Sequence, residues 1–354
     1  MEIWTSTVAS PRGIIKTAQQ FEQAGWDGLV VVDSQNLSGD PYVALAMAAA
    51  NTETIGLGTG VTNSVTRHAA ATATAIASVQ RVAEGRAVLG IGRGDSALAH
   101  LGRAPARLDQ FERYVRHLQA YLKGEAVAFS EIDIPKEIAG PVAALELADS
   151  PTESAIEWMA DTDKVPVEVA ATGPKVIAIG ALHSDRVVFT LGADIDRLRW
   201  GIEIARQARE DAGLDPDAIK FGAYINCACH EDVDVARRVV RGGLTTFARF
   251  SVMHGQTSGP LSDGDAQVLG RLHDYYDMTK HTRGDSRQAE TLTEDFVDRF
   301  AIVGAPETCV KQLQSLQNLG LDKVILSLAG RGAPAQEAAE ARALFENEVL
   351  TQFD

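Results

Sequence analysis

The sequence predicts an α/β fold, a (β/α)8 TIM barrel with insertions after the fourth and the seventh strand. Short β-rich apolar runs alternate with longer helical runs along the chain, which is typical of a parallel sheet covered by helices. The chain contains eight such units, and eight units favour a closed barrel over an open doubly wound sheet. Because the 354 residues are 45% hydrophobic, we expect a sizeable core and one domain over residues 1–354.

The first four units follow one another at regular spacing. Ser10 is the expected N-cap of the first helix, with Pro11 at its first helical position. Asp40 and Pro41 begin the second helix in the same way, and Gly85 ends the third. The four expected strands span residues 2–8, 28–33, 54–61 and 86–92, and the second is a continuous apolar run of the buried parallel type.

The spacing becomes irregular after the fourth strand. An amphipathic stretch at 104–124 predicts a helix, and residues from about 124 to 164 then form an insertion with a small hairpin and a short helix. A second insertion, from about 250 to 300, is expected to be mainly helical. The other expected strands span 165–171, 185–191, 219–229 and 322–328, with helices at 174–184, 194–213 and 305–320 and after residue 330.

Composition and charge exclude several classes of protein. The net charge is -15, and Lys and Arg do not cluster, so we expect no nucleic-acid partner. The chain shows neither a signal peptide nor a run of about twenty apolar residues, so we expect no membrane span. The odd number of cysteines, Cys227, Cys229 and Cys309, indicates buried free thiols in a cytoplasmic protein.

Two acidic residues stand where a barrel carries its active site, at the carboxyl ends of the strands. Asp33 follows the second expected strand and Asp95 follows the fourth. Each has an alternative role as a helix cap or turn residue. Two acids that face one crevice can share a proton at neutral pH, since burial and mutual repulsion favour the protonated form, so a catalytic role is also open.

Glycines follow the third and fourth strands as two G-x-G-x-G runs, at 56–60 and 90–94. Neither run fits the dinucleotide fingerprint G-x-G-x-x-G, which also needs an acid about twenty residues later. We interpret these glycines as positions where a flat ring approaches the backbone. The tetrapeptide Arg-Gly-Asp-Ser at 93–96 resembles an adhesion motif, but adhesion requires an extracellular loop, and we interpret the match as coincidence.

Two further strand ends run directly into helices. The stretches Ala-Thr-Gly-Pro-Lys at 171–175 and Thr-Leu-Gly-Ala-Asp at 190–194 place free backbone N–H groups and a positive helix end where a phosphate can bind. Ordinary helix capping is the alternative. The histidines show no H-x-x-x-H or H-E-x-x-H spacing, so we expect no metal, and no G-x-S-x-G marks a serine nucleophile.

Four stretches together carry a family resemblance. They are TETIGLGTGVTNSVTRH (52–68), GRAVLGIGRGDSALAHLG (85–102), VPVEVAATGPK (165–175) and FAIVGAPE (300–307). The chain resembles, from residue 1 to about 330, the bacterial luciferase-like superfamily of flavin and deazaflavin barrel enzymes. The branch it resembles most is the methylenetetrahydromethanopterin reductases, which use coenzyme F420.

The resemblance implies a homodimer and a set of site residues. It implies a non-prolyl cis peptide between Gly60 and Val61, in a bulge behind the deazaflavin ring, and it matches Asp33 and Asp95 to acidic positions of the reductase site. The reductases also carry a glutamate near the end of strand 1, where this chain has Thr5 or Ser6. The implied coenzyme-binding residues are Gly60, Val61, Thr62 and Asn63 at the ring, and Gly173, Pro174, Lys175, Gly192 and Ala193 near the phosphate.

Three functions follow from these observations. The first is an F420-dependent oxidoreductase that moves a hydride between the deazaflavin and a small or medium organic substrate, a pterin- or folate-type methylene compound being one candidate. The second is an FMN-dependent monooxygenase that is supplied by a separate flavin reductase. The third is a non-catalytic flavin or deazaflavin carrier, against which the presence of both Asp33 and Asp95 argues.

Overall fold

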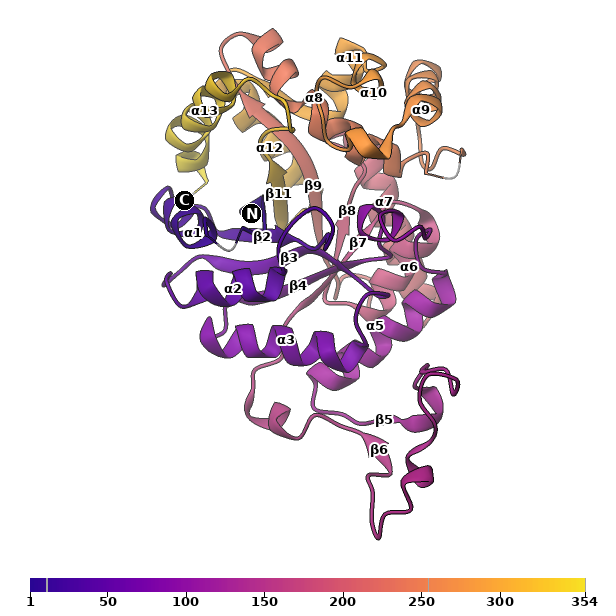
Figure 1. Cartoon of the computed structure of the whole chain (residues 1–354). Coiled ribbons are helices and arrows are strands. Elements are labelled where there is room, and N and C mark those ends of the chain that lie inside the picture. Colours follow the sequence, from indigo (N-terminus) through magenta and orange to yellow (C-terminus); the bar gives the residue numbers. More distant parts are fainter. Residues whose placement is uncertain (11, 254, 354) are drawn as a thin grey trace.

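Eight parallel strands close into a barrel, with the helices on its outside (Figure 1). The computed structural model describes residues 1–10, 12–253 and 255–353. Strand β1 pairs with β2 and β11, and β9 pairs with both β8 and β11, which closes the ring. The barrel strands are β1 (Glu2–Val8), β2 (Gly28–Val32), β3 (Gly56–Asn63), β4 (Ala87–Gly92), β7 (Val167–Ala171), β8 (Arg186–Phe189), β9 (Lys220–Cys229) and β11 (Lys323–Ser327).

A further strand joins the sheet at a place that the sequence did not predict. Strand β10 (Ala301–Gly304) pairs in parallel with the end of β9, from Asn226 to Cys229, whereas β8 pairs with the start of β9. The ten-residue β9 therefore continues past the end of β8 and has a second neighbour there. A four-residue apolar run directly after a helix has too little periodicity to be recognised as a strand.

The helices form the outer layer of the barrel. Helix α2 begins with Asp40 as N-cap, whose carboxylate accepts from the backbone N–H of Tyr42 and Val43, as predicted. Helix α1 instead begins later than predicted, with Gly13 as N-cap in place of Ser10, and Pro11 lies outside the described residues. The outer helices are α1 (Ile14–Gln23), α2 (Pro41–Ala49), α3 (Ala69–Val82), α5 (Leu108–Leu122), α6 (Pro174–His183), α7 (Ile195–Asp211), α8 (Val233–Phe250), α12 (Pro306–Leu319) and α13 (Ala335–Leu344).

The base of the barrel is filled by side chains. Trp4 lies across it, and a Cβ at Gly28 or Gly56 would come within 2.2 Å or 2.6 Å of the indole, so both neighbouring strands need glycine there. Lys323 is fully buried, with Nζ 3.3 Å from the centre of the Trp4 ring and 3.0 Å from Glu168 Oε1. The barrel is therefore closed at the amino ends of its strands, which leaves the carboxyl ends for a ligand.

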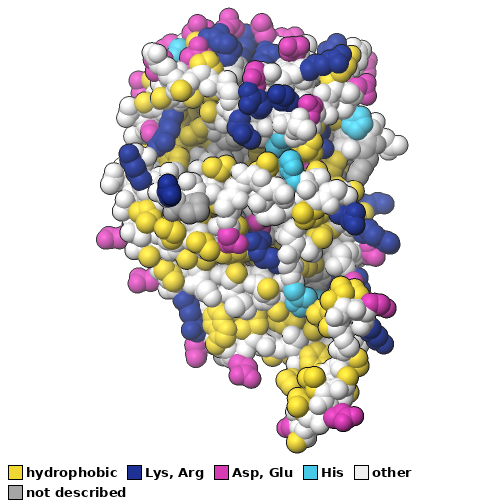
Figure 2. All heavy atoms as spheres, in the orientation of Figure 1, with side chains coloured by type: hydrophobic (Ala, Val, Ile, Leu, Met, Phe, Trp, Pro, Cys, Tyr) yellow, Lys and Arg dark blue, Asp and Glu magenta, His cyan; other side chains and the backbone are white. Residues whose placement is uncertain are grey.

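Residues between α5 and β7 form an arm that projects below the barrel (Figure 1). The antiparallel pair of β5 (Val127–Ala128) and β6 (Glu153–Ser154) holds it together, with three short 3-10 helices, η1 (Phe129–Glu131), η2 (Val142–Leu145) and η3 (Glu157–Asp161). Hydrophobic side chains lie along the arm in Figure 2. The arm residues Ile138 and Leu145 are 77% and 64% exposed. The arm lies at the opposite end of the barrel from the carboxyl ends of the strands.

Residues that follow α8 lie over the carboxyl ends of the strands (Figure 1). They form α9 (Asp263–Tyr275), η4 (Met278–Lys280), α10 (Arg287–Glu290) and α11 (Glu294–Phe300), and the chain ends in the π-helical turn η5 (Phe345–Val349) and in η6 (Leu350–Gln352). Cys227, Cys229 and Cys309 are buried free thiols, as predicted. Among the helices of the described residues, none is both long enough and apolar enough to cross a membrane.

Candidate active site

A cavity of about 690 Å³ opens at the carboxyl ends of the barrel strands. Its walls come from or directly after all eight barrel strands, from α8 and from the segment that follows α8. Tyr224 of β9 stacks on Phe247 of α8, with ring centres 6.0 Å apart, and both side chains line the cavity. The predicted site residues Asp33, Asp95, Gly60, Val61, Thr62, Asn63 and Gly173 also line it.

Strand β3 bulges where it meets the cavity. The peptide bond between Gly60 and Val61 is cis, as the resemblance implies, and the pairing register with β4 shifts between Thr59 and Thr62. A Cβ at Gly60 would lie 2.3 Å from Val30, and a Cβ at Gly90 would lie 2.2 Å from the carbonyl oxygen of Thr59. These two glycines are therefore required by the packing of the protein itself.

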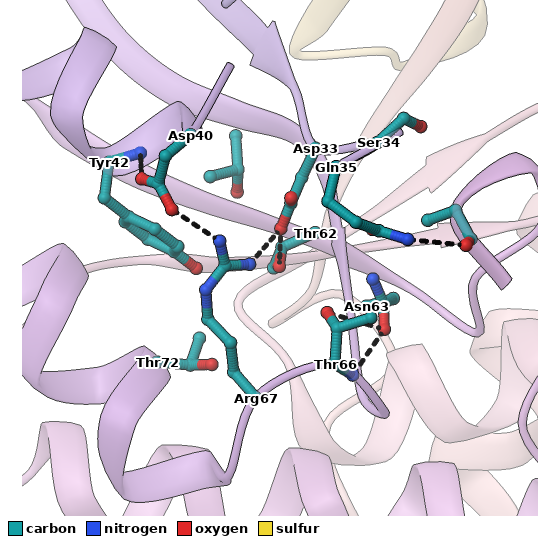
Figure 3. Close-up of polar contacts among 12 residues, drawn as sticks. Asp33, Ser34, Gln35, Asp40, Tyr42, Thr62, Asn63, Thr66, Arg67 and Thr72 are labelled. Carbon is teal, nitrogen blue, oxygen red and sulfur yellow. Dashed lines mark hydrogen bonds and ion pairs between the residues drawn. The ribbon is translucent and has the colours of Figure 1, made fainter. Parts of the chain in front are cut away.

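Asp33 is held by partners from two other segments (Figure 3). The Asp33 side chain is 1% exposed, and its carboxylate accepts a hydrogen bond of 2.7 Å from the Thr62 hydroxyl and pairs with Arg67 at 2.5 Å. The same guanidinium binds Asp40 at 2.8 Å and lies over the ring of Tyr42, 5.0 Å from its centre. Asp33 is therefore fixed at the cavity wall by Arg67, which is not among the predicted site residues.

Asp95 also pairs with an arginine, and this one comes from far along the chain. It occupies the N-cap position of the short helix α4 (Ser96–Ala99), but its side chain makes no capping hydrogen bond to the described residues. The carboxylate instead forms an ion pair with Arg249 of α8. The Ser34 and Ser96 hydroxyls, 2.9 Å apart, join the two loops that carry Asp33 and Asp95.

Arg249 belongs to a cluster on the side of the cavity formed by α8 and the residues after it. Its guanidinium lies 4.6 Å from the centre of the Tyr276 ring, and the Tyr276 hydroxyl is 2.8 Å from Nδ1 of His281. His281 itself lines the cavity. Burial lowers the pKa of His281 to about 4, although Asp95 acts in the opposite direction, so the imidazole is neutral at pH 7.

The residues predicted to bind a phosphate do not all reach the cavity. Gly173 lines it, whereas Pro174 and Lys175 of α6 do not belong to the described lining. Gly192 and Ala193 also lie outside that lining: the Ala193 N–H donates to the Phe300 carbonyl at 3.0 Å, and a Cβ at Gly192 would lie 2.8 Å from the Phe300 ring. Their contact with a phosphate stays a prediction.

Two features of the cavity wall suit a flat polar ring that carries a phosphate. The Asn63 Oδ1 accepts from the backbone of Val65 and Thr66, while its buried Nδ2 has no partner in the described part of the chain. Gly173 has ordinary φ and ψ of -86° and 152°, and a Cβ there would meet no described atom within 4 Å. Packing does not require glycine at Gly173, so a close ligand is the better reason for it.

Sequence reasoning located the acids but missed their partners and the histidine. Arg67 lies inside the stretch at 52–68 that carries the resemblance, so a signal for it was present without a role attached. Arg249, Tyr276 and His281 come from α8 and the second insertion, where no motif could be recognised. Within the residues described, no group of three or more His, Cys, Asp and Glu side chains is arranged to hold a metal ion.

Comparison with known proteins identifies the family of the chain. The model of the luciferase-like monooxygenase family matches residues 2–323. The chain belongs to the luciferase-like monooxygenase family. This family member is 27% identical to the 5,10-methylenetetrahydromethanopterin reductase of Methanolobus tindarius. The alignment spans 315 residues and covers 87% of each of the two chains. It is 31% identical over 200 residues to the F420-dependent glucose-6-phosphate dehydrogenase of Beutenbergia cavernae, covering 52% of this chain and 54% of the relative.

A solved structure shares the whole fold of this luciferase-like protein. The coenzyme F420-dependent tetrahydromethanopterin reductase of Methanopyrus kandleri superimposes with a TM-score of 0.73 at 20% sequence identity. The superposition covers 100% of this chain and 99% of the reductase. The likeness confirms the predicted (β/α)8 barrel.

Proposed function

We propose that this luciferase-like protein is an F420-dependent oxidoreductase that transfers a hydride between the deazaflavin and a small or medium organic substrate. The observation that carries the proposal is the cavity at the strand ends, where the β3 bulge and two ion-paired aspartates form one wall. The relatives support the coenzyme, because the B. cavernae dehydrogenase is named as F420-dependent and the M. tindarius relative as a reductase.

The residues present fit that coenzyme in two places. The bulge residues Gly60, Val61 and Thr62 with Asn63 would hold the ring, the free Asn63 Nδ2 offering a donor to a ring carbonyl. Gly173 would hold the phosphate, and Pro174, Lys175, Gly192 and Ala193 remain predicted neighbours of it. When bound, the deazaflavin supplies a hydride and does not activate oxygen as a flavin does. The protein supplies the positioning and the polar groups, among them Asp33 and Asp95.

Titration with F420 and with FMN tests the coenzyme. We expect quenching of F420 fluorescence on binding, with an affinity at least tenfold higher than that for FMN. FMN binding tighter by tenfold would make the protein a monooxygenase that depends on a separate reductase. Binding of F420 without turnover of any substrate would make it a carrier.

Gly173→Leu tests the location of the phosphate. The added side chain would fill the open space at Gly173, and we expect weaker F420 binding in a protein that unfolds at the same temperature. Gly140→Leu in the arm is the matched control, because a Cβ there also meets no described atom within 4 Å. Equal F420 affinity in both variants would move the phosphate away from Gly173.

The assembly and location of the protein are part of the same proposal. We expect a homodimer in the cytoplasm that binds a small-molecule substrate. The exposed apolar side chains of the arm support association, and three free thiols support a reducing compartment. Light scattering at micromolar concentration would give a mass twice that of the 37.8 kDa chain, and a monomer mass would contradict the dimer.

A further inference from the structure

His281 is placed between Tyr276 and the cavity. Its Nδ1 is engaged by the Tyr276 hydroxyl at 2.8 Å, while the ring lines the cavity. Behind this pair, Arg249 stacks on Tyr276 and binds Asp95, and the Thr246 hydroxyl lies 3.4 Å from the Tyr276 oxygen. The hydrogen bond at Nδ1 thus orients the imidazole, and Nε2 makes no hydrogen bond to the described residues.

The hydrogen bond to Tyr276 determines which nitrogen of His281 carries the hydrogen. A phenol is more acidic than a neutral imidazole N–H, and an imidazole nitrogen is more basic than a phenolic oxygen. The phenol therefore donates and Nδ1 accepts, and burial raises the pKa of Tyr276, which keeps the phenol protonated. Neutral His281 then carries its single hydrogen on Nε2.

Two side chains of the described lining carry an uncharged donor on a ring, the His281 imidazole and the Tyr224 phenol. Strand β1 has no acid near its end: Thr5 is 1% exposed and donates to the Leu326 carbonyl at 3.3 Å, and Ser6 offers only a hydroxyl. Asp33 and Asp95 are both bound to arginines. Among the described ionisable side chains of the lining, His281 alone is held neutral with a free N–H.

We propose that the Nε2–H of His281 is the hydrogen-bond donor to the carbonyl oxygen of the substrate, and that Tyr276 is its positioning residue. The proposal rests on the proposed hydride transfer and names its substrate class, a neutral ketone or aldehyde and the corresponding alcohol. In the reduction, the carbonyl π bond breaks, the carbon gains the two-electron hydride of the reduced coenzyme, and the oxygen takes a proton from water. Oxidation of the alcohol is the reverse.

The charges around the cavity favour this substrate over a methylene iminium compound. An iminium carbon is positively charged and offers no lone pair to an N–H donor. Arg93 and Arg331 line the cavity, and neither pairs with a carboxylate of the described residues. A carbonyl oxygen gains negative charge during hydride addition, so a neutral N–H donor and nearby guanidinium groups stabilise it more in the transition state than before.

The tautomer can be tested without coenzyme. In a long-range ¹H–¹⁵N spectrum of the ¹⁵N-histidine-labelled protein at pH 7, the His281 signals, assigned by their loss in His281→Gln, should show an unprotonated Nδ1 and a protonated Nε2. In Tyr276→Phe the preference for this tautomer should weaken. A protonated Nδ1 in the wild-type protein would overturn the proposal.

Turnover tests the substrate class once F420 binding has been measured separately by fluorescence. Reduced F420 is mixed with cyclohexanone, acetophenone or benzaldehyde, and with methylenetetrahydrofolate. We expect turnover of a carbonyl compound, a loss of about 10²-fold in kcat for His281→Phe, and a smaller loss for His281→Gln, which keeps an N–H donor. His183→Phe, at the end of α6 and outside the described lining, is the matched control and should keep its activity.

Each other outcome of the turnover test is decisive. If F420 binds but none of the three carbonyl compounds is reduced, or if His281→Phe reduces them at the wild-type rate, His281 is not the carbonyl donor. Reduction of methylenetetrahydrofolate alone would also overturn the assignment while leaving the F420-dependent function intact. Absence of F420 binding would instead refute the proposed function, and the present proposal with it.

Discussion

At the residue scale, the two acids of the site are defined by arginines that lie elsewhere in the sequence. Their positions after β2 and β4 could be predicted, because carboxyl ends of barrel strands carry the site. Arg67 and Arg249 could not be predicted as partners, since pairing across 34 and 154 positions depends on the closed barrel and on the path of α8. The same holds for His281, which follows α9 in a segment without a motif.

Asp33→Ala should destabilise the protein. The Asp33 side chain is 1% exposed and that of Arg67 is 22% exposed, so the substitution leaves a largely buried guanidinium with Asp40 as its one carboxylate partner among the described residues. Removal of one member of such a pair costs about 3 kcal/mol. Urea unfolding at pH 7 measures this loss. Asp109→Ala breaks an exposed pair with Arg107 and is the control; an equal change in both variants would contradict the prediction.

Asp95→Asn should lower hydride transfer at least about tenfold and leave F420 affinity unchanged. An acid–base or polarising side chain typically contributes about 10²–10⁴-fold. Asn keeps the shape of the side chain but loses the charge that binds Arg249. Single-turnover oxidation of reduced F420 with a carbonyl probe measures the rate. If the variant is fully active, Asp95 serves only to bind Arg249, and Asp33 is the acid that assists hydride transfer.

His281 should make stability depend on pH below neutrality. Its pKa is near 4 in the folded protein, where burial and the cations Arg249 and Arg331 outweigh Asp95, and near 6.5 when unfolded. Between these two pH values the unfolded chain binds more protons than the folded protein. The contribution of neutral His281 to the free energy of unfolding is therefore complete above pH 6.5 and is lost as the pH falls to 4. The shift corresponds to roughly 3 kcal/mol.

Comparison of wild-type and His281→Gln proteins isolates this contribution. We expect the variant to lose less stability than the wild type between pH 7 and pH 4.5 in urea unfolding, since glutamine does not titrate. His183→Gln, whose ring pairs with Glu112 away from the cavity, serves as the control. Parallel pH profiles for the wild type and His281→Gln would show that the ring is not held neutral by the fold.

At the element scale, the barrel strands could be predicted because buried parallel strands are apolar runs between helices with clear caps. The strands β2, β4, β7 and β9 lie within one or two residues of their expected bounds. Strand β10 could not be predicted, because it is four residues long and its place beside β9 depends on β8 ending early. The glycines of β3 and β4 were interpreted as making room for a ligand ring, but Gly60 and Gly90 also make room for neighbouring strands.

Gly90→Ala should therefore destabilise the pairing of β3 with β4. The new methyl group would lie 2.2 Å from the Thr59 carbonyl oxygen, which belongs to the backbone and cannot rotate away. Overpacking of this kind costs about 1–3 kcal/mol. Gly140→Ala, where the methyl group meets no described atom within 4 Å, is the control for urea unfolding. Equal urea midpoints of unfolding for the two variants would show that β3 can shift with little loss of stability.

At the scale of the whole molecule, the two ends of the barrel differ: the carboxyl end forms a cavity, and the amino end is filled by buried charged side chains. The carboxyl end carries the cavity, and part of the cavity wall comes from the second insertion. The sequence of this insertion contains no motif that indicates a binding site. The amino end carries Glu168, Arg186 and Lys323, which lie within predicted strands but are not among the predicted site residues. Inward-facing charged residues at strand starts resemble solvated strand ends in sequence, and only closure of the barrel buries them.

Removal of one charged side chain at the amino end should therefore lower the stability of the protein strongly. Removal of both members of the Glu168–Lys323 ion pair should lower it much less. Lys323 is fully buried, and burial lowers its pKa although Glu168, bound at 3.0 Å and 3.1 Å, opposes this. Glu168→Leu leaves the ammonium with the Trp4 ring as its described contact and should cost about 3–5 kcal/mol. Adding Lys323→Met should restore most of that loss, because an apolar pair needs no compensation.

Urea unfolding of the single and double variants measures this coupling, and F420 titration supplies an independent check on its location. Glu168 lies on β7 and Lys323 on β11, 155 positions apart, so their ion pair links the middle of the chain to its last strand across the interior of the barrel. Because the pair lies at the closed end, the double variant should bind F420 as the wild type does. Arg186 also binds Glu168, and it pairs with Glu2 at 3.0 Å. If the double variant were as unstable as Glu168→Leu alone, the instability would come from Arg186, which loses the Glu168 carboxylate, and not from Lys323.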